Sequence, residues 1–402
     1  MDSDEEQVQP WQSLAMGLGF SSSDEEFWWT TFAQPLSRLM EWAKYPIFEQ
    51  YRVLAFLHRY VIPSCGPRPY QTGEQFWKTF LSFDHTPIQL SINFYDSKAT
   101  VRTSNVPICA LSGSALDPIN QKASIDTLNA QQHLAPGNDL HWFDHFTKAF
   151  FLPSDEAYLL TARVSDRILA MQAVQCILSY DFPYYATQTK QIGELIVTAI
   201  KELGDETADY MHSLGMLETF LDSGAAEKTG VSAAFLSFDT NLSDKYKSSR
   251  IKIYLATPRS AFNRLVDIFT LGGRLIGPEM ERAIPALRLL WSSVMNIPED
   301  ISNDTDISPL NSHRCANFIF NFEIWAGAPF PTPKIYLPVA YYGKPDLEIA
   351  EGMDSFSKVR AGTSPSIHTE RIMCCPVHGV NWKFSVLPGD FRQIGSTGTY
   401  SY

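Results

Sequence analysis

The chain has 402 residues, 45% of them hydrophobic and 13% aromatic, which is enough for one large globular domain or two to three ordinary ones. A net charge of −12 excludes the basic face that a nucleic-acid-binding protein needs, and it disfavours binding to anionic membranes. The acidic start at Met1–Glu6, the lack of an apolar run of membrane-spanning length and six scattered cysteines predict a cytoplasmic protein.

The first elements in chain order are helices. Residues 1–23 are polar and acidic, so we expect a flexible N-terminus. Ser23-Asp24-Glu25-Glu26 has the pattern of a capping box and predicts a helix after it, and apolar spacing predicts a second helix over 48–62. Strict alternation then predicts a strand over 88–95, paired with a return strand at 100–103.

The same order of helices followed by a strand pair recurs along the chain. Helical patterns cover parts of 117–170, 191–222 and 278–295, and strand pairs are expected at 233–239 with 250–256, at 317–324 with 334–339, and around 174–186. Leu271-Gly272-Gly273-Arg274 predicts a helix end and turn. This repeat of helix, two strands and helix favours an α+β fold, in which one closed antiparallel sheet is ringed by helices.

The predicted strands have one polar and one apolar face. Arg250, Lys252 and Tyr254 share a face, and Lys334 shares one with Tyr336. Polar residues alternate in the same way at Gln89, Ser91, Asn93 and Tyr95, and at Asn317, Asn321 and Glu323. For a single strand, a solvated face is the simplest interpretation. The many helices need the apolar faces, however, so the polar faces should line the interior, where buried cations need an anion such as a diphosphate.

Several phosphate and metal motifs are absent from the sequence. No Gly-rich phosphate loop, His-Glu-x-x-His or Asp-Asp-x-x-Asp run is present, and Cys374-Cys375-Pro376-Val377-His378 has no second ligand pair nearby. We therefore expect no metal and no cofactor, and a diphosphate held by protein cations alone.

Ordered fragments along the chain resemble fungal aromatic prenyltransferases of the dimethylallyltryptophan-synthase type. The resemblance covers residues 10–355. It rests on Pro10-Trp11-Gln12, Phe27-Trp28-Trp29, Tyr51-x-x-Leu54-Ala55-Phe56, Thr86–Asn93, Trp142–Phe146, Arg250-x-Lys252-x-Tyr254, Thr270–Gly273 and Pro333–Pro338.

The resemblance implies a prenyltransferase barrel over residues 24–356, built from repeated α-β-β-α units. It also implies metal-independent transfer of a dimethylallyl group from dimethylallyl diphosphate to an aromatic, indole-containing metabolite, as in fungal alkaloid and other secondary-metabolite biosynthesis. By the same resemblance the prenyl diphosphate is bound by Arg102, Arg250, Lys252, Tyr254, Lys334 and Tyr336, and Gln89 contacts the acceptor. We expect small-molecule partners only, and a monomer or homodimer.

The chain departs from the family pattern at four places. Gln89 stands where the family often has Glu, and Gln175-Cys176-Ile177 lacks the Lys of tryptophan-prenylating members, which argues against free tryptophan as acceptor. A Lys-x-Tyr strand is missing after Phe182, and residues 357–402 diverge from the family's closing strand. An incomplete barrel is therefore expected. The alternatives are a phenolic or polyketide acceptor, or a catalytically impaired barrel that only binds aromatic ligands.

Overall fold

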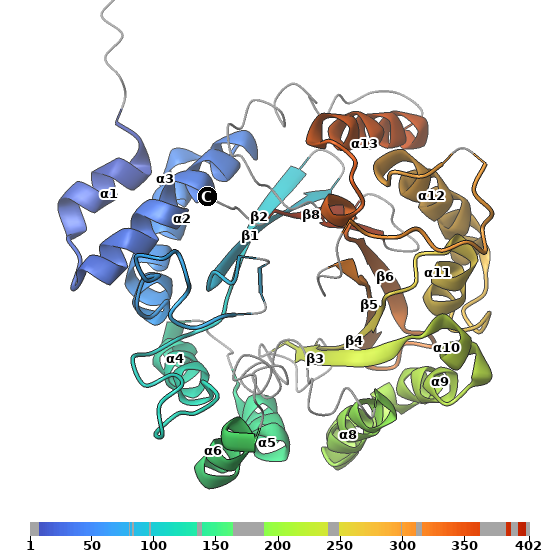
Figure 1. Cartoon of the computed structure of the whole chain (residues 1–402), viewed down its shortest axis with the longest axis horizontal. Helices are drawn as coiled ribbons and strands as arrows, with labels where there is room; N and C mark the ends of the chain where they lie inside the picture. Colours follow the sequence, from blue (N-terminus) through green and yellow to red (C-terminus); the bar gives the residue numbers. More distant parts are fainter. Residues whose placement is uncertain are drawn as a thin grey trace, which may run out of the picture.

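The strands form one antiparallel sheet in the order β2-β1-β8-β7-β6-β5-β4-β3. The computed structural model describes residues 8–79, 81–82, 84–95, 98–134, 139–163, 189–239, 249–298, 300–310, 316–361, 383–386 and 393–398. The strands are β1 (Ile88–Tyr95), β2 (Lys98–Asn105), β3 (Ser232–Phe238), β4 (Arg250–Thr257), β5 (Phe318–Trp325), β6 (Thr332–Leu337), β7 (Lys383–Val386) and β8 (Gln393–Gly398). Figure 1 shows them curving around one axis, and in the described residues β2 and β3 are the edges of the sheet.

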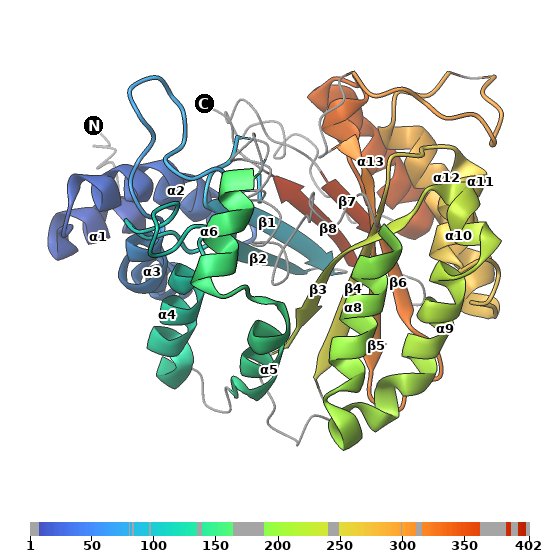
Figure 2. The same cartoon turned by 60° about the horizontal axis from the view of Figure 1, so that its bottom comes forward.

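The helices form an outer ring around this sheet (Figures 1 and 2). They are α1 (Pro10–Leu18), α2 (Ser23–Trp42), α3 (Ile47–Phe56), α4 (Lys122–Gln131), α5 (His141–Phe150), α6 (Ser154–Arg163), α8 (Thr189–Lys201), α9 (Met211–Leu221), α10 (Gly224–Thr229), α11 (Phe262–Phe269), α12 (Pro278–Val294) and α13 (Asp346–Ala361). The predicted α+β class, the antiparallel sheet and its position inside the helices are confirmed. Within the described residues, no helix has the length and apolar character needed to cross a membrane.

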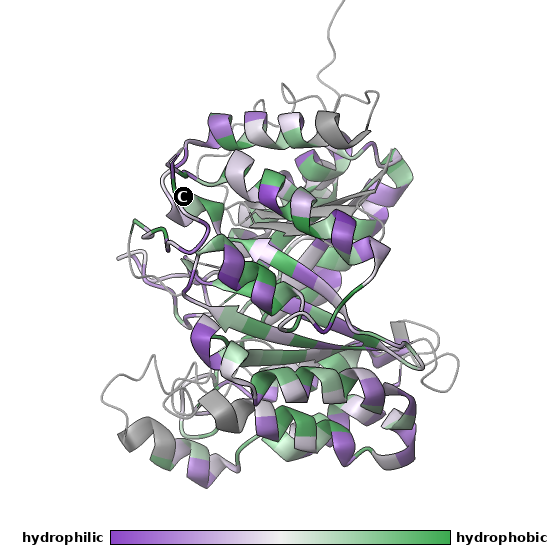
Figure 3. Ribbon diagram, turned by 90° about the vertical axis from the view of Figure 1, so that its right-hand side faces the viewer, coloured by the Kyte–Doolittle hydropathy of each residue, from purple (hydrophilic) through white to green (hydrophobic). Residues whose placement is uncertain are grey.

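The main hydrophobic core lies between the sheet and the helices. Ile251, Ile253 and Leu255 of β4 are fully buried in one cluster with Leu265 of α11 and Leu290 of α12. Figure 3 shows that the outer helices alternate hydrophobic and hydrophilic residues, as helices with one buried face do. Because the apolar faces of the strands are used in this core, their polar faces are directed to the interior, as the sequence predicts.

The N-terminal helices form a second core against β1. Residues 10–18, expected in a flexible terminus, form α1, and Trp11 packs against the buried cluster that contains Trp29 of α2. The cap of α2 is one residue earlier than predicted, because Ser22 Oγ accepts a hydrogen bond from the Glu25 N–H at 3.2 Å. The predicted 48–62 helix begins as α3 and continues as a π turn and a short 3-10 turn to Ser64.

The C-terminal segment differs most from the expectation. Residues 357–402 were expected to lack a closing strand, yet β7 pairs with β6, and β8 joins β7 to β1. The register runs from Leu90 opposite Gly398 to Tyr95 opposite Gln393. This segment therefore bridges the two halves of the sheet. The strand pair expected around 174–186, with its missing Lys-x-Tyr strand, lies outside the described residues.

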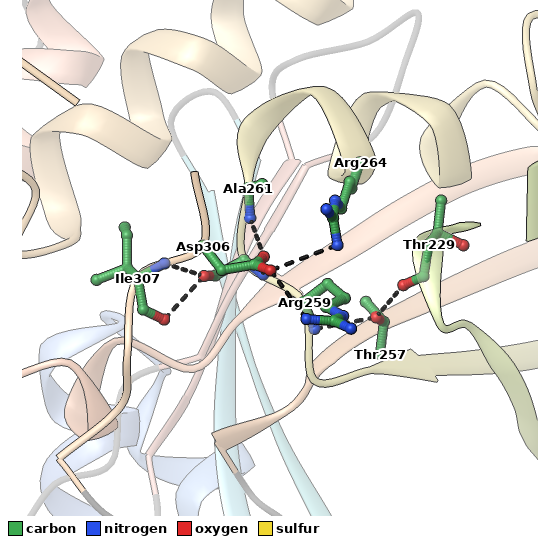
Figure 4. A network of polar contacts seen from close by, with 8 residues as sticks. Thr229, Thr257, Arg259, Ala261, Arg264, Asp306 and Ile307 are labelled. Atoms are coloured by element: carbon green, nitrogen blue, oxygen red, sulfur yellow. Dashed lines mark hydrogen bonds and ion pairs between the residues drawn. The ribbon is translucent and has the colours of Figure 1, made fainter. Parts of the chain in front are cut away.

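A polar clamp fixes the 300–310 segment to the start of α11 (Figure 4). Asp306 Oδ1 accepts hydrogen bonds from the N–H groups of Ser260 and Ala261 at 2.8 and 2.9 Å, and its Oδ2 pairs with Arg259 and Arg264. Burial alone would raise the pKa of Asp306, but these backbone donors and the two guanidinium groups outweigh it and hold the pKa below its usual range.

We expect Asp306→Asn to lower the free energy of unfolding by about 1–2 kcal/mol at pH 7, since it removes a charge that accepts several bonds. A carboxylate whose pKa is depressed in the folded state stabilises above its unfolded pKa, and that stability is lost as the pH falls through the folded pKa. Denaturant unfolding at pH 7 and near pH 3 should therefore show a smaller wild-type advantage at the lower pH. Asp304→Asn, which loses only an exposed bond to Asn263, is the matched control. An equal effect of both variants at pH 7 would contradict this assignment.

Candidate active site

The inner face of the sheet carries the predicted polar residues. Positions along β4 from Arg250 to Thr257 alternate between half-buried and buried, and β6 alternates in the same way from Thr332 to Leu337. The half-buried set includes Arg250, Lys252, Tyr254, Lys334 and Tyr336. β5 lies between these strands, and Asn321 is the register partner of both Tyr254 and Lys334. Pairing thus brings five of the seven predicted site residues onto the two strands that flank β5.

Two carboxylates hold the cations of β4 in place. The Arg250 guanidinium donates from Nε and Nη2 to Asp239 at 2.8 and 3.2 Å, and from Nη1 to Glu323 at 3.3 Å. Lys252 Nζ lies 3.4 Å from Asp239 Oδ1. The guanidinium carbon of Arg250 also lies 5.1 Å from the centre of the Trp325 ring. This network keeps two positive groups ordered on a partly buried surface.

Burial and ion pairing shift the pKa values of Lys252 and Asp239 in this cluster. Burial lowers the pKa of Lys252, and the charge of Asp239 offsets part of that effect. Burial would raise the pKa of Asp239, but the hydrogen bond from Arg250 and the charge of Lys252 bring it below its usual range. A diphosphate near Lys252 would favour its charged form, so ligand binding and protonation reinforce each other.

Beside the cations lies a stack of aromatic rings. The ring centres of Phe235 and Tyr254 are 3.8 Å apart, and those of Tyr254 and Tyr336 are 6.3 Å apart with planes at 28°. Lys334 Nζ lies 5.3 Å from the centre of the Tyr336 ring. Burial raises the pKa of Tyr336 to about 12 and also raises that of Tyr254, so both phenols stay protonated and can donate hydrogen bonds. Their π faces can stabilise a carbocation.

The two remaining predicted residues come from the opposite edge of the sheet. Arg102 of β2 is exposed, and its positive charge offsets part of the rise that burial causes in the pKa of Tyr336, so it acts on the phenol cluster. Gln89 of β1 is half-buried and is the register partner of Ser104. β8 and β7 separate β1 from β6, so Gln89 is three strand spacings, about 14 Å along the curved sheet, from the Tyr336 strand. Gln89 therefore lies on a different part of the sheet from the cations of β4 and β6.

Residues that were given no role from the sequence complete the site. Asp239 at the end of β3 and Phe235 within it share the inner face, and Glu323 lies on it through β5. The alternation of polar and apolar residues around these positions is visible in the sequence, but the side chains that they contact depend on which strands pair. Among the described residues, no three His, Cys, Asp or Glu side chains form a group able to hold a metal ion. The segment Cys374–His378 lies outside them.

The arrangement can bind a polyanion next to a developing cation. Guanidinium and ammonium groups bind diphosphate oxygens and stabilise the charge on a leaving diphosphate. The adjacent aromatic rings exclude water and stabilise positive charge on an allylic group.

The known proteins that this chain resembles are prenyltransferases, which agrees with the chemistry inferred from the site. The tryptophan dimethylallyltransferase family matches residues 24–364. An indole diterpene prenyltransferase of Penicillium janthinellum is 70% identical over 379 residues, covering 91% of this chain and 86% of the relative. One from Penicillium paxilli is 57% identical, covering 92% and 87%. A 7-dimethylallyltryptophan synthase of Aspergillus fumigatus is 29% identical, covering 87% and 78%.

Solved structures share the fold across the whole chain. AnaPT from Neosartorya fischeri superposes with a TM-score of 0.79 at 21% identity, covering 98% of each chain. The NotF prenyltransferase in complex with brevianamide F and DMSPP superposes with a TM-score of 0.74 at 24% identity, covering 98% of this chain and all of that one. The predicted resemblance and enzyme class are confirmed, and the chain belongs to the tryptophan dimethylallyltransferase family of prenyltransferases.

Proposed function

We propose that this prenyltransferase moves a dimethylallyl group from dimethylallyl diphosphate to the indole ring of an indole diterpene, without a metal ion. The names of its relatives, at up to 70% identity, support the acceptor class. The observation that carries the proposal is the placement of Arg250, Lys252 and Lys334 beside the stacked Tyr254 and Tyr336 on one inner face.

In the proposed reaction the bond between C1 of the prenyl group and the bridging diphosphate oxygen breaks, and its electron pair stays on that oxygen. Arg250 and Lys252 exchange their bonds to Asp239 for bonds to the diphosphate, and the charge they carry stabilises the leaving group. A π pair of the indole then forms the new carbon–carbon bond, and the ring proton passes to the released diphosphate, whose oxygens can accept it. Tyr254 and Tyr336 shield the allylic cation from water between these steps.

We further propose that the sheet closes as a barrel through its edges β2 and β3, with residues 24–356 as the prenyltransferase domain and 357–402 as a divergent segment that adds β7 and β8. The fold shared over 98% of the chain with AnaPT supports this closure. A cytoplasmic location and a monomeric or homodimeric state stay predictions.

Turnover should be unchanged in excess EDTA. The cations of the inner face can neutralise the diphosphate, and the sequence has no aspartate-rich run to hold magnesium beside it. Product formation is measured by liquid chromatography after dialysis against EDTA, with and without added magnesium. Loss of turnover that magnesium restores would show that a metal carries part of the diphosphate charge.

Replacing Gln89 by Glu should raise kcat/KM for N–H indoles about fivefold, roughly 1 kcal/mol, because a carboxylate accepts the indole N–H more strongly as positive charge develops on the ring. Phenolic acceptors, which have no N–H at that position, should gain little, and they serve as the matched substrates. The measurement also tests the phenolic alternative. An equal gain on both acceptor classes would place Gln89 away from the indole nitrogen.

A further inference from the structure

One buried polar group of the site has a function that the proposed mechanism does not yet use. Asn321 lies in the middle of β5 on the inner face, between its register partners Tyr254 and Lys334. Its side chain is only 1% exposed, and its Oδ1 atom has no hydrogen-bond partner among the described residues. A buried acceptor without a partner destabilises the folded state, so its retention beside a reacting centre points to a ligand.

The nitrogen end of the Asn321 amide interacts with the two tyrosines of the site. Burial raises the pKa of Tyr254 and of Tyr336, and hydrogen bonding with Asn321 offsets part of that rise, which is the effect of an amide N–H donor on a phenol oxygen. An asparagine amide has two N–H donors and one carbonyl acceptor. With the nitrogen directed at the two phenols, the carbonyl oxygen is fixed next to the same aromatic rings and has only the interior of the sheet left to face.

We propose that Asn321 is a catalytic residue whose carbonyl oxygen contacts the allylic cation, while its N–H groups fix the two tyrosine rings that flank that cation. The inference rests on the proposed function and adds a residue to its mechanism. The carbonyl end of an amide dipole carries partial negative charge, and in a site with little water it stabilises a nearby cation without reorganising. The bond broken and the bond formed are those already described, and Asn321 gains and loses no proton.

The unpartnered Oδ1 atom of Asn321 is suited to bind the cation rather than the other reacting groups. The diphosphate is an anion and would be repelled by a carbonyl oxygen, so it belongs with Arg250 and Lys252. The indole N–H is expected near Gln89, three strands from β6. Among the reacting groups, the ionised prenyl chain is the one that must lie against the Tyr254–Tyr336 stack, where Oδ1 is held.

The test compares Asn321→Leu, Asn321→Asp and the control Asn317→Leu, which is the same change four residues earlier on the chain. For each variant we would measure kcat, the affinity for a thio analogue of the prenyl diphosphate that does not ionise, and the share of prenyl group released as prenyl alcohol. Ionisation is also followed by prenyl alcohol release without any indole. Thermal unfolding checks that each variant is folded.

We expect Asn321→Leu to lower the ionisation rate about 10- to 100-fold, with the analogue affinity within about twofold of wild type and a larger alcohol share. Asn321→Asp keeps an oxygen at the same place and should recover most of the rate, while Asn317→Leu should behave as wild type. An unchanged rate in Asn321→Leu, a loss of analogue affinity equal to the loss of rate, or an effect on the acceptor KM alone would overturn the inference. If wild type releases prenyl alcohol but prenylates no indole, the proposed function fails, and the alcohol assay still decides the role of Asn321.

Discussion

Replacing Arg250 by alanine is expected to lower kcat/KM about 100-fold, a loss of roughly 2.7 kcal/mol of transition-state stabilisation. Two effects act in the same direction. The diphosphate loses a bidentate donor, and Asp239 and Glu323, which Arg250 neutralises at 2.8 and 3.3 Å, are left facing the incoming anion.

Arg250→Lys separates the two effects, because it keeps the charge and loses the planar fork. We expect it to fall between wild type and Arg250→Ala. Lys201→Ala is the control, since it removes an exposed cation paired with Glu218 on the outer helices. Steady-state kinetics with varied prenyl diphosphate provide the measurement. Wild-type kinetics in Arg250→Ala would mean that β4 does not face the diphosphate.

Deleting residues 383–402 should abolish both solubility and turnover. These residues contain β7 and β8, which are the only described link between β6 and β1 in the sheet. Their removal leaves the backbone groups of Leu90–Tyr95 without their β8 partners. Each buried group left unpaired costs about 1–3 kcal/mol, and a typical domain has only about 5–15 kcal/mol of stability.

A chain that ends at Gly398 is the matched control, because it keeps both strands and loses only the last residues. Soluble yield, thermal unfolding and product formation are compared for the two deletions and the full chain. If the chain lacking 383–402 unfolds at the wild-type temperature and turns over normally, the pairing of β8 with β1 does not support the fold.

The repeated strand pairs were predictable from sequence because their signal is local. Along Arg250–Ala256 a period of two separates cations and tyrosine from Ile and Leu, and the abundance of helices indicates which face is buried. The same reasoning gave the inner face of β6 and placed Gln89 opposite the apolar residues of β1. These are properties that adjacent residues determine.

The features of the fold and site that could not be predicted from the sequence depend on contacts between distant residues. The segment Gln393–Gly398 has two glycines and one strongly β-forming apolar residue, so nothing local marks it as a strand; it is one because β1, about three hundred residues earlier, pairs with it. Asp239 likewise is the last residue of a predicted strand, but its role emerges only when β3 pairs with β4 and brings it to Arg250. The amide of Asn321 needed both neighbouring strands before its unpartnered oxygen could be recognised.

The most direct test of the whole account is mass spectrometry of products formed by the wild-type protein. The protein is incubated in EDTA with dimethylallyl diphosphate and a matched panel of indole diterpenes, simple indoles, tryptophan and phenols. We expect indole diterpenes to gain one five-carbon prenyl unit, with far less product from tryptophan and the phenols, and Arg250→Ala to give about 100-fold less product under the same conditions. Prenylation of phenols in preference to indole diterpenes, or equal product from Arg250→Ala, would contradict the account.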